Sequence, residues 1–383
     1  MHNQIQEEIF LMFYASVAML SLIACCYLLF RRSNAIAPDV TPPVRLRRWT
    51  ATFLAAIALC HLWYLPTYFL TTPDDMMLGS LIAGLLDSMT VIPLAIVVLL
   101  VMLQDRRRPL WPVAVMVAPL IAGNVWGIAA RSFALLSVLY AYFLLMWLGL
   151  IIYMVRGTRQ YGRWLRDNYA DLEHKEVWQS FVVLAIILLV YTIYSLDVGE
   201  MIYEYALDVI VIVLVCYLLW RVETLSDLSI PVNDPRDLNV PDKRGRGISP
   251  GESFNIRNSI GSLLQQHCID KQLYLQHDLT LHQLAKTIGT NRYYLSQYFS
   301  NQGTTYNAYI NDLRINHFVS LYREAVDSKR SITAQQLALE SGFRSYNTFR
   351  DSFKRKTGQA VTAWMKAASE REQAGQEGKV GKP

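Results

Sequence analysis

The chain has 383 residues, of which 53% are hydrophobic and 17% are charged, and its formal net charge is +5. So many apolar residues with so few charges exclude an ordinary soluble protein. Nearly all the long apolar runs precede Arg221, whereas residues 253–366 contain fourteen Lys or Arg against seven Asp or Glu. The sequence therefore predicts two parts, one suited to lipid and one suited to water.

Seven apolar segments follow one another in the first 220 residues: 9–30, 50–70, 77–103, 110–130, 133–155, 179–196 and 201–220. A helix that rises ~1.5 Å per residue needs about 20 residues to cross ~30 Å of hydrocarbon, and each segment has about this length. Buried helices of a soluble protein are the alternative, but seven such runs leave too little polar surface to cover them. We expect residues 1–221 to form a seven-helix transmembrane domain.

Basic residues are unevenly shared between the loops that join these segments. The loops after the first, third and fifth segments hold thirteen Lys or Arg, and the alternate loops hold only Arg131. Because Lys and Arg are retained on the cytoplasmic side, this asymmetry predicts an N-terminus outside and a C-terminus inside. The expected location is the inner (cytoplasmic) membrane, crossed several times, with the C-terminal part in the cytoplasm.

Five polar residues fall in the outer half or the middle of the predicted spans: His61, Asp87, Asn124, Glu204 and Asp208. A charge in hydrocarbon costs at least ~2.5–3.5 kcal/mol at a helix centre, so these groups are expected to face the bundle interior, to be neutral, or to pair with one another and with Arg131. One interpretation is a structural network of interhelical hydrogen bonds. The other is a sensor site, either a pocket for a polar or cationic small molecule or a proton-sensitive switch built on His61.

The chain changes character after the last apolar run. Residues 222–252 contain four prolines with scattered charges and predict a flexible linker. Residues 253–368 form the basic part, which has no run long enough to span a bilayer. Residues 369–383 are mostly Glu, Gln, Gly and Lys without an apolar period, and predict a disordered tail.

One ten-residue pattern, Thr-x-x-Gln-Leu-Ala-x-x-x-Gly, occurs at residues 280–289 and again at residues 333–342. Its Thr is a natural helix N-cap, its Leu-Ala pair lies on one helix face, and its Gly supplies a turn. A second helix comes after each copy, with Leu295 and Phe299 facing inward in the first and Phe349 and Phe353 in the second. The spacing predicts two helix-turn-helix units, which a helix over residues 306–323 connects.

Residues of about 256–366 resemble the DNA-binding domain of AraC/XylS-type transcription regulators. The resemblance is carried by Leu284-Ala285, Gly289, Tyr294-Leu295, Phe299, Tyr309-Ile310, Arg314-Ile315, Ile332, Leu337-Ala338, Ser341-Gly342-Phe343, Phe349, Phe353-Lys354 and Gly358. The chain departs from the family pattern at Phe318, where a small Ala is usual, and at Met365, where an Arg is common. The resemblance implies a double helix-turn-helix fold and double-stranded DNA as the partner.

The outer faces of the two second helices are polar, aromatic and basic, as a helix that reads base edges requires. Asn and Gln can pair bidentately with adenine and Arg with guanine, whereas other basic side chains are better placed for phosphates. The candidate DNA-binding residues are Arg292, Tyr293, Ser296, Gln297, Arg344, Ser345, Tyr346, Asn347, Arg350, Lys354 and Lys356. A rigid connecting helix would place the two reading helices in successive major grooves, about 34 Å apart.

We expect an all-α protein, a polytopic seven-helix transmembrane bundle followed by a cytoplasmic AraC-type double helix-turn-helix domain, that regulates transcription from the membrane. RNA polymerase and a second copy of the chain are further expected partners. No phosphate-binding Gly-rich loop, Gly-x-Ser-x-Gly or metal-ligand spacing occurs, so no enzyme activity, cofactor or metal is expected. Alternatives are a membrane domain that only anchors or that is a transporter-like or enzymatic module, and helix-turn-helix units that bind protein alone.

Overall fold

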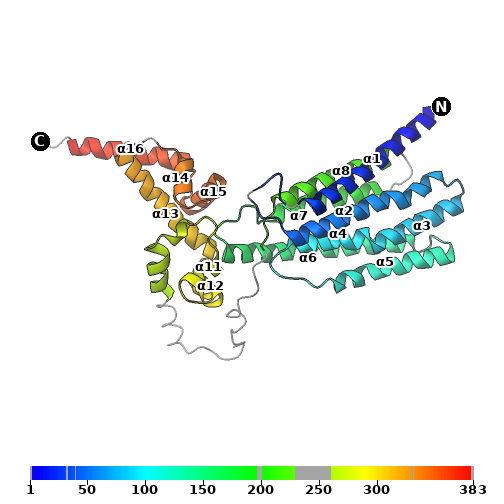
Figure 1. Ribbon diagram of the computed structural model, residues 1–383, viewed down its shortest axis with the longest axis horizontal. Helices are drawn as coiled ribbons and strands as arrows, with labels where there is room; N and C mark the ends of the chain where they lie inside the picture. Colours follow the sequence, from blue (N-terminus) through cyan, green and yellow to red (C-terminus); the bar gives the residue numbers. More distant parts are fainter. Residues whose placement is uncertain are drawn as a thin grey trace, which may run out of the picture. The chain divides into compact units, whose positions relative to one another are not determined.

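The computed structural model describes residues 2–31, 33–38, 40–195, 201–228, 260–328, 330 and 332–380 (Figure 1). Within these residues the regular elements are all helices, as predicted, and a single isolated bridge joins Tyr169 to Thr280. The chain divides into two compact units: unit 1 comprises residues 1–162 and 174–230, and unit 2 comprises residues 163–173 and 231–383. Residues 163–173, predicted as a loop of the membrane domain, therefore belong to the C-terminal unit.

Unit 1 is a bundle of long helices. It contains α1 (His2–Phe30), α2 (Val44–Tyr64), the short 3-10 helix η1 (Leu65–Phe69), α3 (Pro73–Met89), α4 (Val91–Met102), α5 (Trp111–Ala130), most of α6 (Leu136–Asn168), α7 (Trp178–Ser195) and α8 (Met201–Thr224). Helix α1 packs against α2 and α8, α2 also packs against α4, α3 against α5, and α7 against α8. Helices α1, α2 and α8 thus pack against one another.

Six spans of the described chain are long and apolar enough to cross a membrane: Glu8–Phe30, Val44–Phe69, Pro73–Met102, Trp111–Ala130, Leu136–Asn168 and Glu204–Thr224. Their outward faces carry apolar side chains such as Met12, Leu145 and Val213, which are 66%, 66% and 51% exposed. An apolar outer surface of this kind suits lipid, because no water is needed to solvate it. These six spans fit the predicted membrane domain.

The predicted seventh crossing falls on α7. The apolar part of this helix, Trp178–Val190, is shorter than a full span, and residues 196–200, where the predicted segment ends, lie outside the described residues. The seventh crossing therefore stays a prediction.

The predicted third span is bent between α3 and α4. Thr90 has φ −125° and ψ −71°, outside the helical region, while its N–H still bonds the Leu86 carbonyl at 3.0 Å. Pro93 has no N–H to offer the Met89 carbonyl, so a continuous helix would lack one hydrogen bond here. The proline explains why one apolar run forms two helices.

Unit 2 contains the predicted helix-turn-helix pair. Its elements are the π-helical turn η2 (Gln265–Ile269), the 3-10 turn η3 (Leu273–Leu275), α11 (Leu281–Thr287), α12 (Arg292–Asn301), α13 (Tyr306–Asp327), α14 (Ala334–Glu340), α15 (Tyr346–Thr357) and α16 (Val361–Val380). Helices α11 and α12 form the first helix-turn-helix unit, α14 and α15 form the second, and α13 is the connecting helix.

Two predicted irregular segments differ from the structure. Helix α16 continues to Val380, where a disordered tail from residue 369 was expected, because the Ala, Glu, Gln and Lys of this segment are strong helix formers. The linker was expected from residue 222, but helix α8 extends to Thr224. Residues 229–259, which hold the rest of the predicted linker, lie outside the described residues.

The core of unit 2 is divided into two clusters along α13. The first cluster lies under α11 and α12 and contains Leu284, Leu295 and Phe299, and the second lies under α14 and α15 and contains Leu337, Phe349 and Phe353. Helix α13 contributes Tyr306 and Ile310 to the first cluster, and Ile315 and Phe318 to the second. Each buried side chain of this size contributes about 1.5–3 kcal/mol to stability relative to an exposed one. Both helix-turn-helix units are therefore packed against α13.

The large Phe318, which stands where the resembling family has a small Ala, is fully buried in the second cluster. Its ring centroid lies 4.4 Å from that of Phe349 and 5.7 Å from that of Phe353. These distances are typical of favourable aromatic pairs. The larger side chain is therefore accommodated in the second core cluster, against α15.

Candidate functional site

The first helix of each helix-turn-helix unit begins at a capping box. The hydroxyl of Thr280 accepts a hydrogen bond from the Gln283 backbone N–H at 3.2 Å, and the Thr280 N–H donates to the Gln283 side chain at 2.8 Å. Thr333 and Gln336 repeat this exchange at 3.2 Å in both directions. The repeated Thr-x-x-Gln thus has a local structural role, because it satisfies backbone donors that a helix start leaves free.

The two second helices, α12 and α15, are here named the reading helices, and both begin at a side-chain cap. The Asn291 carboxamide oxygen accepts from the Tyr294 N–H at 3.0 Å, and the Ser345 hydroxyl accepts from the Thr348 N–H at 3.3 Å. Ser345, a predicted DNA contact, therefore has a structural role at the start of α15.

The turn of the second helix-turn-helix unit requires glycine for two reasons. Gly342 has φ +91°, a conformation that side chains with a Cβ rarely adopt. An added Cβ at Gly342 would also lie 2.7 Å from the Cα atom of Leu275 in η3. Gly289, the equivalent in the first unit, has φ +74° but no atom within 4 Å of an added Cβ. Only the second turn is packed against another segment.

The outer face of α12 carries all four residues predicted for it. Tyr293 is 56% exposed and Gln297 is exposed, while Arg292 and Ser296 are partly exposed. Leu295, on the opposite face, is fully buried. The packing of the first core therefore fixes which side of α12 is presented to solvent.

The outer face of α15 presents Asn347, Arg350 and Lys354, all exposed. Tyr346 is half-buried, and its ring centroid lies 5.8 Å from that of Phe349 in the core. The Arg350 Nε lies 3.2 Å from the Asp351 carboxylate, but both groups are more than half exposed, so the pair is weak and leaves Arg350 available. This face offers an amide and a guanidinium of the kinds that pair with bases.

Two predicted phosphate contacts have partners inside unit 2. Arg344 Nη1 lies 3.3 Å from the carboxylate of Asp278. Lys356 Nζ donates to the Asp312 carbonyl and to the Asn316 side-chain oxygen, both at 2.9 Å. Lys356 thereby links α15 to the connecting helix. Exposed pairs of this kind contribute only about 0–1 kcal/mol, so a phosphate can compete with them.

The connecting helix contains a fully buried arginine that the sequence did not single out as a site. The Arg314 Nε donates to the Tyr274 carbonyl at 2.7 Å, and its Nη2 donates to the Gln276 carbonyl at 2.6 Å. Its guanidinium carbon lies 5.6 Å from the ring centroid of Phe343. Burial lowers the pKa of Arg314 to about 10, which leaves it charged at neutral pH. Arg314 thus contacts both the segment before the first helix-turn-helix unit and Phe343 in the second helix-turn-helix unit.

In unit 1, two of the five predicted sensor residues contact each other. His61 Nε2 lies 3.4 Å from an Asp208 carboxylate oxygen, and both side chains are 7% exposed. His61 Nδ1 is 2.8 Å from the Ile57 carbonyl, and the ring centroids of His61 and Tyr14 are 4.6 Å apart. The partner of Asp208 is therefore His61, and the expected pairing with Arg131 is not observed among the described residues.

Two more predicted sensor residues lie near the end of α2 and the short helix η1 that follows it. Asp87 accepts hydrogen bonds from the Trp63 indole at 3.1 Å and from the Tyr64 hydroxyl at 2.9 Å. Glu204 lies beside Tyr68 in η1. We name His61, Asp87, Glu204 and Asp208 the carboxylate–histidine cluster. It gathers three acids around the end of α2.

The fifth predicted sensor residue, Asn124, lies outside this cluster. Its amide donates to the Leu120 carbonyl at 2.9 Å and to the Ser88 hydroxyl at 3.4 Å. A Cβ on Gly84 would lie 3.2 Å from the Asn124 side-chain oxygen, so α3 and α5 approach closely here. This arrangement is typical of an interhelical contact between small and polar residues.

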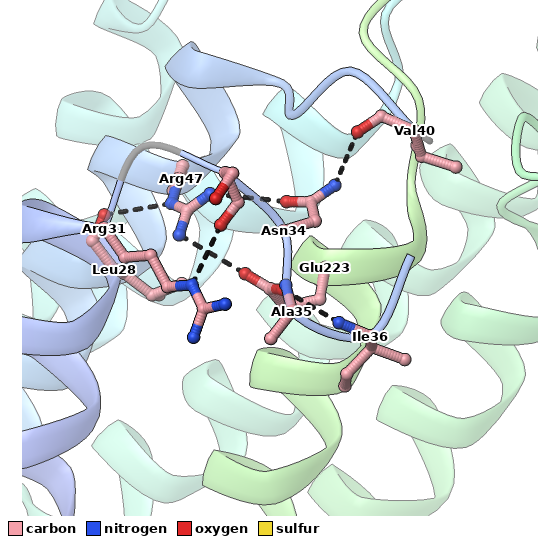
Figure 2. Close-up of polar contacts among 9 residues, drawn as sticks. Leu28, Arg31, Asn34, Ala35, Ile36, Val40, Arg47 and Glu223 are labelled. Carbon is pink, nitrogen blue, oxygen red and sulfur yellow. Dashed lines mark hydrogen bonds and ion pairs between the residues drawn. The ribbon is translucent and has the colours of Figure 1, made fainter. Parts of the chain in front are cut away.

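A buried ion pair lies at the end of α8, where the chain leaves the bundle (Figure 2). Arg47 Nη2 is 3.3 Å from Glu223 Oε1, and the two side chains are 6% and 1% exposed. Arg47 also donates to the Leu28 carbonyl at 3.0 Å and to Asn34 at 3.3 Å. Glu223 Oε2 accepts from the Ala35 N–H. The pair is therefore built from α2, α8 and the loop between α1 and α2.

The residues after Glu223 are held by all three predicted inner loops. The Ser226 N–H donates to the His174 carbonyl at 2.8 Å, and the Asp227 N–H donates to the Thr41 carbonyl at 2.9 Å. The Leu228 N–H donates to the Gln104 side chain at 2.8 Å. We name these contacts, with the Arg47–Glu223 pair, the α8-exit network.

The α8-exit network was not predicted. Arg47 is one of the thirteen basic loop residues that predict the orientation, and Glu223 is the first acidic residue after Asp208 and comes shortly after the last apolar run. An acid at the end of a span where basic residues are expected is a usable signal for a buried pair. Across the described ranges, no group of three or more His, Cys, Asp or Glu could hold a metal ion.

Residues 284–367 match the model of a protein family described as a helix-turn-helix domain. The matched segment runs from α11 into α16 and includes both reading helices and the connecting helix. Neither a curated protein nor a solved structure matches the chain. The match supports a DNA-binding regulator, and the six apolar spans support insertion in a membrane.

Proposed function

Because residues 284–367 form an AraC-type helix-turn-helix domain, we propose that the chain regulates transcription from the membrane by binding promoter DNA through α12 and α15. The observation that carries this proposal is the pair of exposed polar faces, each fixed by its own core and joined by α13. A surface built twice on one rigid connector suits a ligand that repeats, as a duplex does at each helical turn.

Specific side chains supply the two kinds of contact that DNA recognition needs. Gln297 and Asn347 can each bond adenine, and Arg350 can bond guanine, from the exposed sides of the reading helices. Lys354 and the two paired cations Arg344 and Lys356 are suited to phosphates. The net basic charge of this part adds attraction that does not depend on sequence.

Mapping of the DNA that the protein occupies in cells tests this function. We expect a limited set of promoter sites with two short boxes about one helical turn apart. The recovered duplex should bind the purified full chain in lipid nanodiscs more tightly than a random duplex, and the affinity should fall as salt rises. Equal affinity for both duplexes would contradict sequence-specific regulation.

We further propose that the protein lies in the inner membrane with its N-terminus outside and its DNA-binding domain in the cytoplasm. The loops rich in Lys and Arg support this orientation. RNA polymerase and a second copy of the chain are its proposed protein partners at the promoter.

The membrane domain is proposed to sense a small polar or cationic molecule, or protons, through the carboxylate–histidine cluster. Support comes from the number of ionisable groups gathered around α2 and from the second carboxylate oxygen of Asp208, which is buried without a hydrogen bond within the described residues. Ionisable groups at membrane depth are costly and often functional. Passive anchoring, a transporter-like module and a purely structural network are the competing proposals.

Single replacements test the sensing proposal. Asp87→Asn, Asp208→Asn and His61→Gln should each leave the membrane abundance of the protein near normal and change the response of a target promoter. Asp74→Asn, at an exposed position outside the cluster, serves as the control. An unchanged response in all three variants would leave only the anchoring or structural role, and uptake of a substrate by the wild type would favour a transporter.

A further inference from the structure

A short segment that sequence analysis assigned to the membrane domain is part of the core of unit 2. Residues 163–173 comprise the end of α6 and the chain directly after it. Ala170 is 1% exposed and belongs to the first core cluster, together with Leu279 and Tyr306. Tyr169 forms the isolated antiparallel bridge with Thr280, the N-cap residue of α11. This segment, here named the α6 strap, therefore packs as an integral piece of unit 2.

Two buried asparagines of the connecting helix hold the α6 strap. Asn307 and Asn311 lie one turn apart on α13, and each is 3% exposed. Asn307 Nδ2 donates to the Ala170 carbonyl at 2.6 Å and to the Tyr169 carbonyl at 3.2 Å, and Asn311 Nδ2 donates to the Ala170 carbonyl at 3.1 Å. A buried amide that loses its partner is strongly unfavourable, so this face of α13 is made to receive a peptide backbone.

The next residue of the strap reaches the second helix-turn-helix unit. Asp171 is 2% exposed, and its carboxylate accepts a hydrogen bond from the Thr348 hydroxyl at 3.3 Å. Thr348 lies on reading helix α15, directly after Asn347. The Asp171 charge also raises the pKa of Arg314, against the larger lowering by burial. The strap thus contacts the start of α11, the first two turns of α13 and the first turn of α15.

The strap continues directly from a predicted transmembrane helix. Helix α6 has 33 residues, which correspond to ~50 Å at ~1.5 Å per residue, whereas the hydrocarbon core is ~30 Å thick. The helix ends at Asn168, one residue before Tyr169. A change in the position of α6 therefore reaches the strap through continuous helix.

We propose that Tyr169–Asp171 is the natural occupant of the Asn307–Asn311 face, and that α6 with its strap, rather than the linker, couples the membrane domain to the reading helices. The docking half stands on the contacts alone, and the coupling half rests on the proposed function. The amides of the two buried asparagines bind main-chain carbonyls, and the Asp171 carboxylate positions the strap against α15.

Hydrogen exchange of the full chain in lipid nanodiscs tests the docking. Amides of residues 169–173 should be protected in the wild type. Asn307→Leu/Asn311→Leu removes the donors and should speed their exchange by about tenfold or more. Asn316→Leu is the matched control, because Asn316 lies on the same helix, is exposed and contacts Lys356 instead. Fast exchange in the wild type, or unchanged exchange in the double variant, would overturn the proposal.

Two insertions test the coupling. Four glycines placed between Gly162 and Arg163 should abolish the regulated change in occupancy at a target promoter while binding to DNA persists. The same four glycines placed after Pro241 in the linker should leave regulation intact. Equal effects of the two insertions would overturn the coupling through α6. A wild type that binds no specific site would refute the proposed function, and the exchange result would still decide the docking.

Discussion

The guanidinium of Arg47 lies 3.3 Å from the carboxylate of Glu223, and neither side chain reaches solvent to more than 6%. Backbone groups complete the shell, because Arg47 also donates to the Leu28 carbonyl and Glu223 accepts from the Ala35 N–H. A buried pair of this kind is strongly coupled, since each charge makes the burial of the other tolerable. It fixes the end of α8 at the point where the chain leaves the bundle.

Replacing Glu223 with Leu should destabilise the membrane domain by about 3–5 kcal/mol, because Arg47 is left buried without a counter-charge. The double variant Arg47→Met/Glu223→Leu should recover most of this loss, because it buries no charge. Unfolding of the full chain in detergent measures both values. Arg31→Met is the control, since Arg31 is exposed, donates to the nearby Ser33 carbonyl and lies over the Tyr27 ring, and has no buried counter-charge among the described contacts. Equal losses in the single and double variants would show that the charge is unimportant.

Alanine at the two equivalent turn glycines should have unequal effects. Gly289→Ala meets no atom and should cost about 1–2 kcal/mol, the usual penalty of a left-handed conformation. Gly342→Ala carries the same penalty and also brings its Cβ to 2.7 Å from the Leu275 backbone, so it should cost more. Hydrogen exchange in the full chain, followed in α11 for Gly289→Ala and in α14 for Gly342→Ala, measures the difference. Equal costs would mean that η3 can move away from the turn.

Base-reading and phosphate-binding residues should be distinguishable by their effect on specificity. Asn347→Ala and Arg350→Ala should each weaken binding to the cognate duplex by about 1–3 kcal/mol and relax the choice of base at one position. Lys354→Ala, from the same exposed face, should weaken all duplexes alike and reduce the dependence on salt. Titration of cognate and random duplexes with the full chain measures this. Equal losses on both duplexes for Arg350→Ala would remove Arg350 from the base-reading residues.

Reporter fusions should reveal the orientation in the membrane. A reporter enzyme that is active only outside the inner membrane should work when fused at Asp74 and fail when fused at Arg107, because positive charge keeps the second loop inside. A cytoplasmic reporter at the same two sites is the control and should give the opposite pattern. Activity of the outside reporter at Arg107 would reverse the proposed topology.

The helix-turn-helix units could be predicted because their signals are local. Thr280 and Thr333 cap the helices, Gly342 makes a turn, and Phe349 and Phe353 are four residues apart, so each role depends on a few neighbouring residues. Candidate membrane helices could be predicted equally well, because the length of an apolar run decides whether it can span a bilayer. The bend at Thr90 was missed, although Pro93 marks it in the sequence.

The partners within the polar sites could not be predicted from the sequence, because they depend on which helices are neighbours. His61 pairs with Asp208 across 147 positions of the chain, and Arg47 pairs with Glu223 across 176. Apolar runs of similar composition do not indicate which runs pack against each other, so these contacts are visible only in the structure. The burial of Ala170 was harder still to predict, since an alanine in a charged segment does not indicate packing in a core that is distant in the sequence.

The length of α13 sets a limit on how this protein can change. Its 22 residues place Ile310 in one core and Ile315 in the other. Each residue added to an α-helix rotates the remainder of that helix by about 100° and advances it by ~1.5 Å. A single insertion between these positions would rotate one reading helix by about 100° about α13 relative to the other. Under the proposed function, substitutions on α12 and α15 can change the bases that are recognised, but a different spacing between the two boxes has to be met by deforming the DNA.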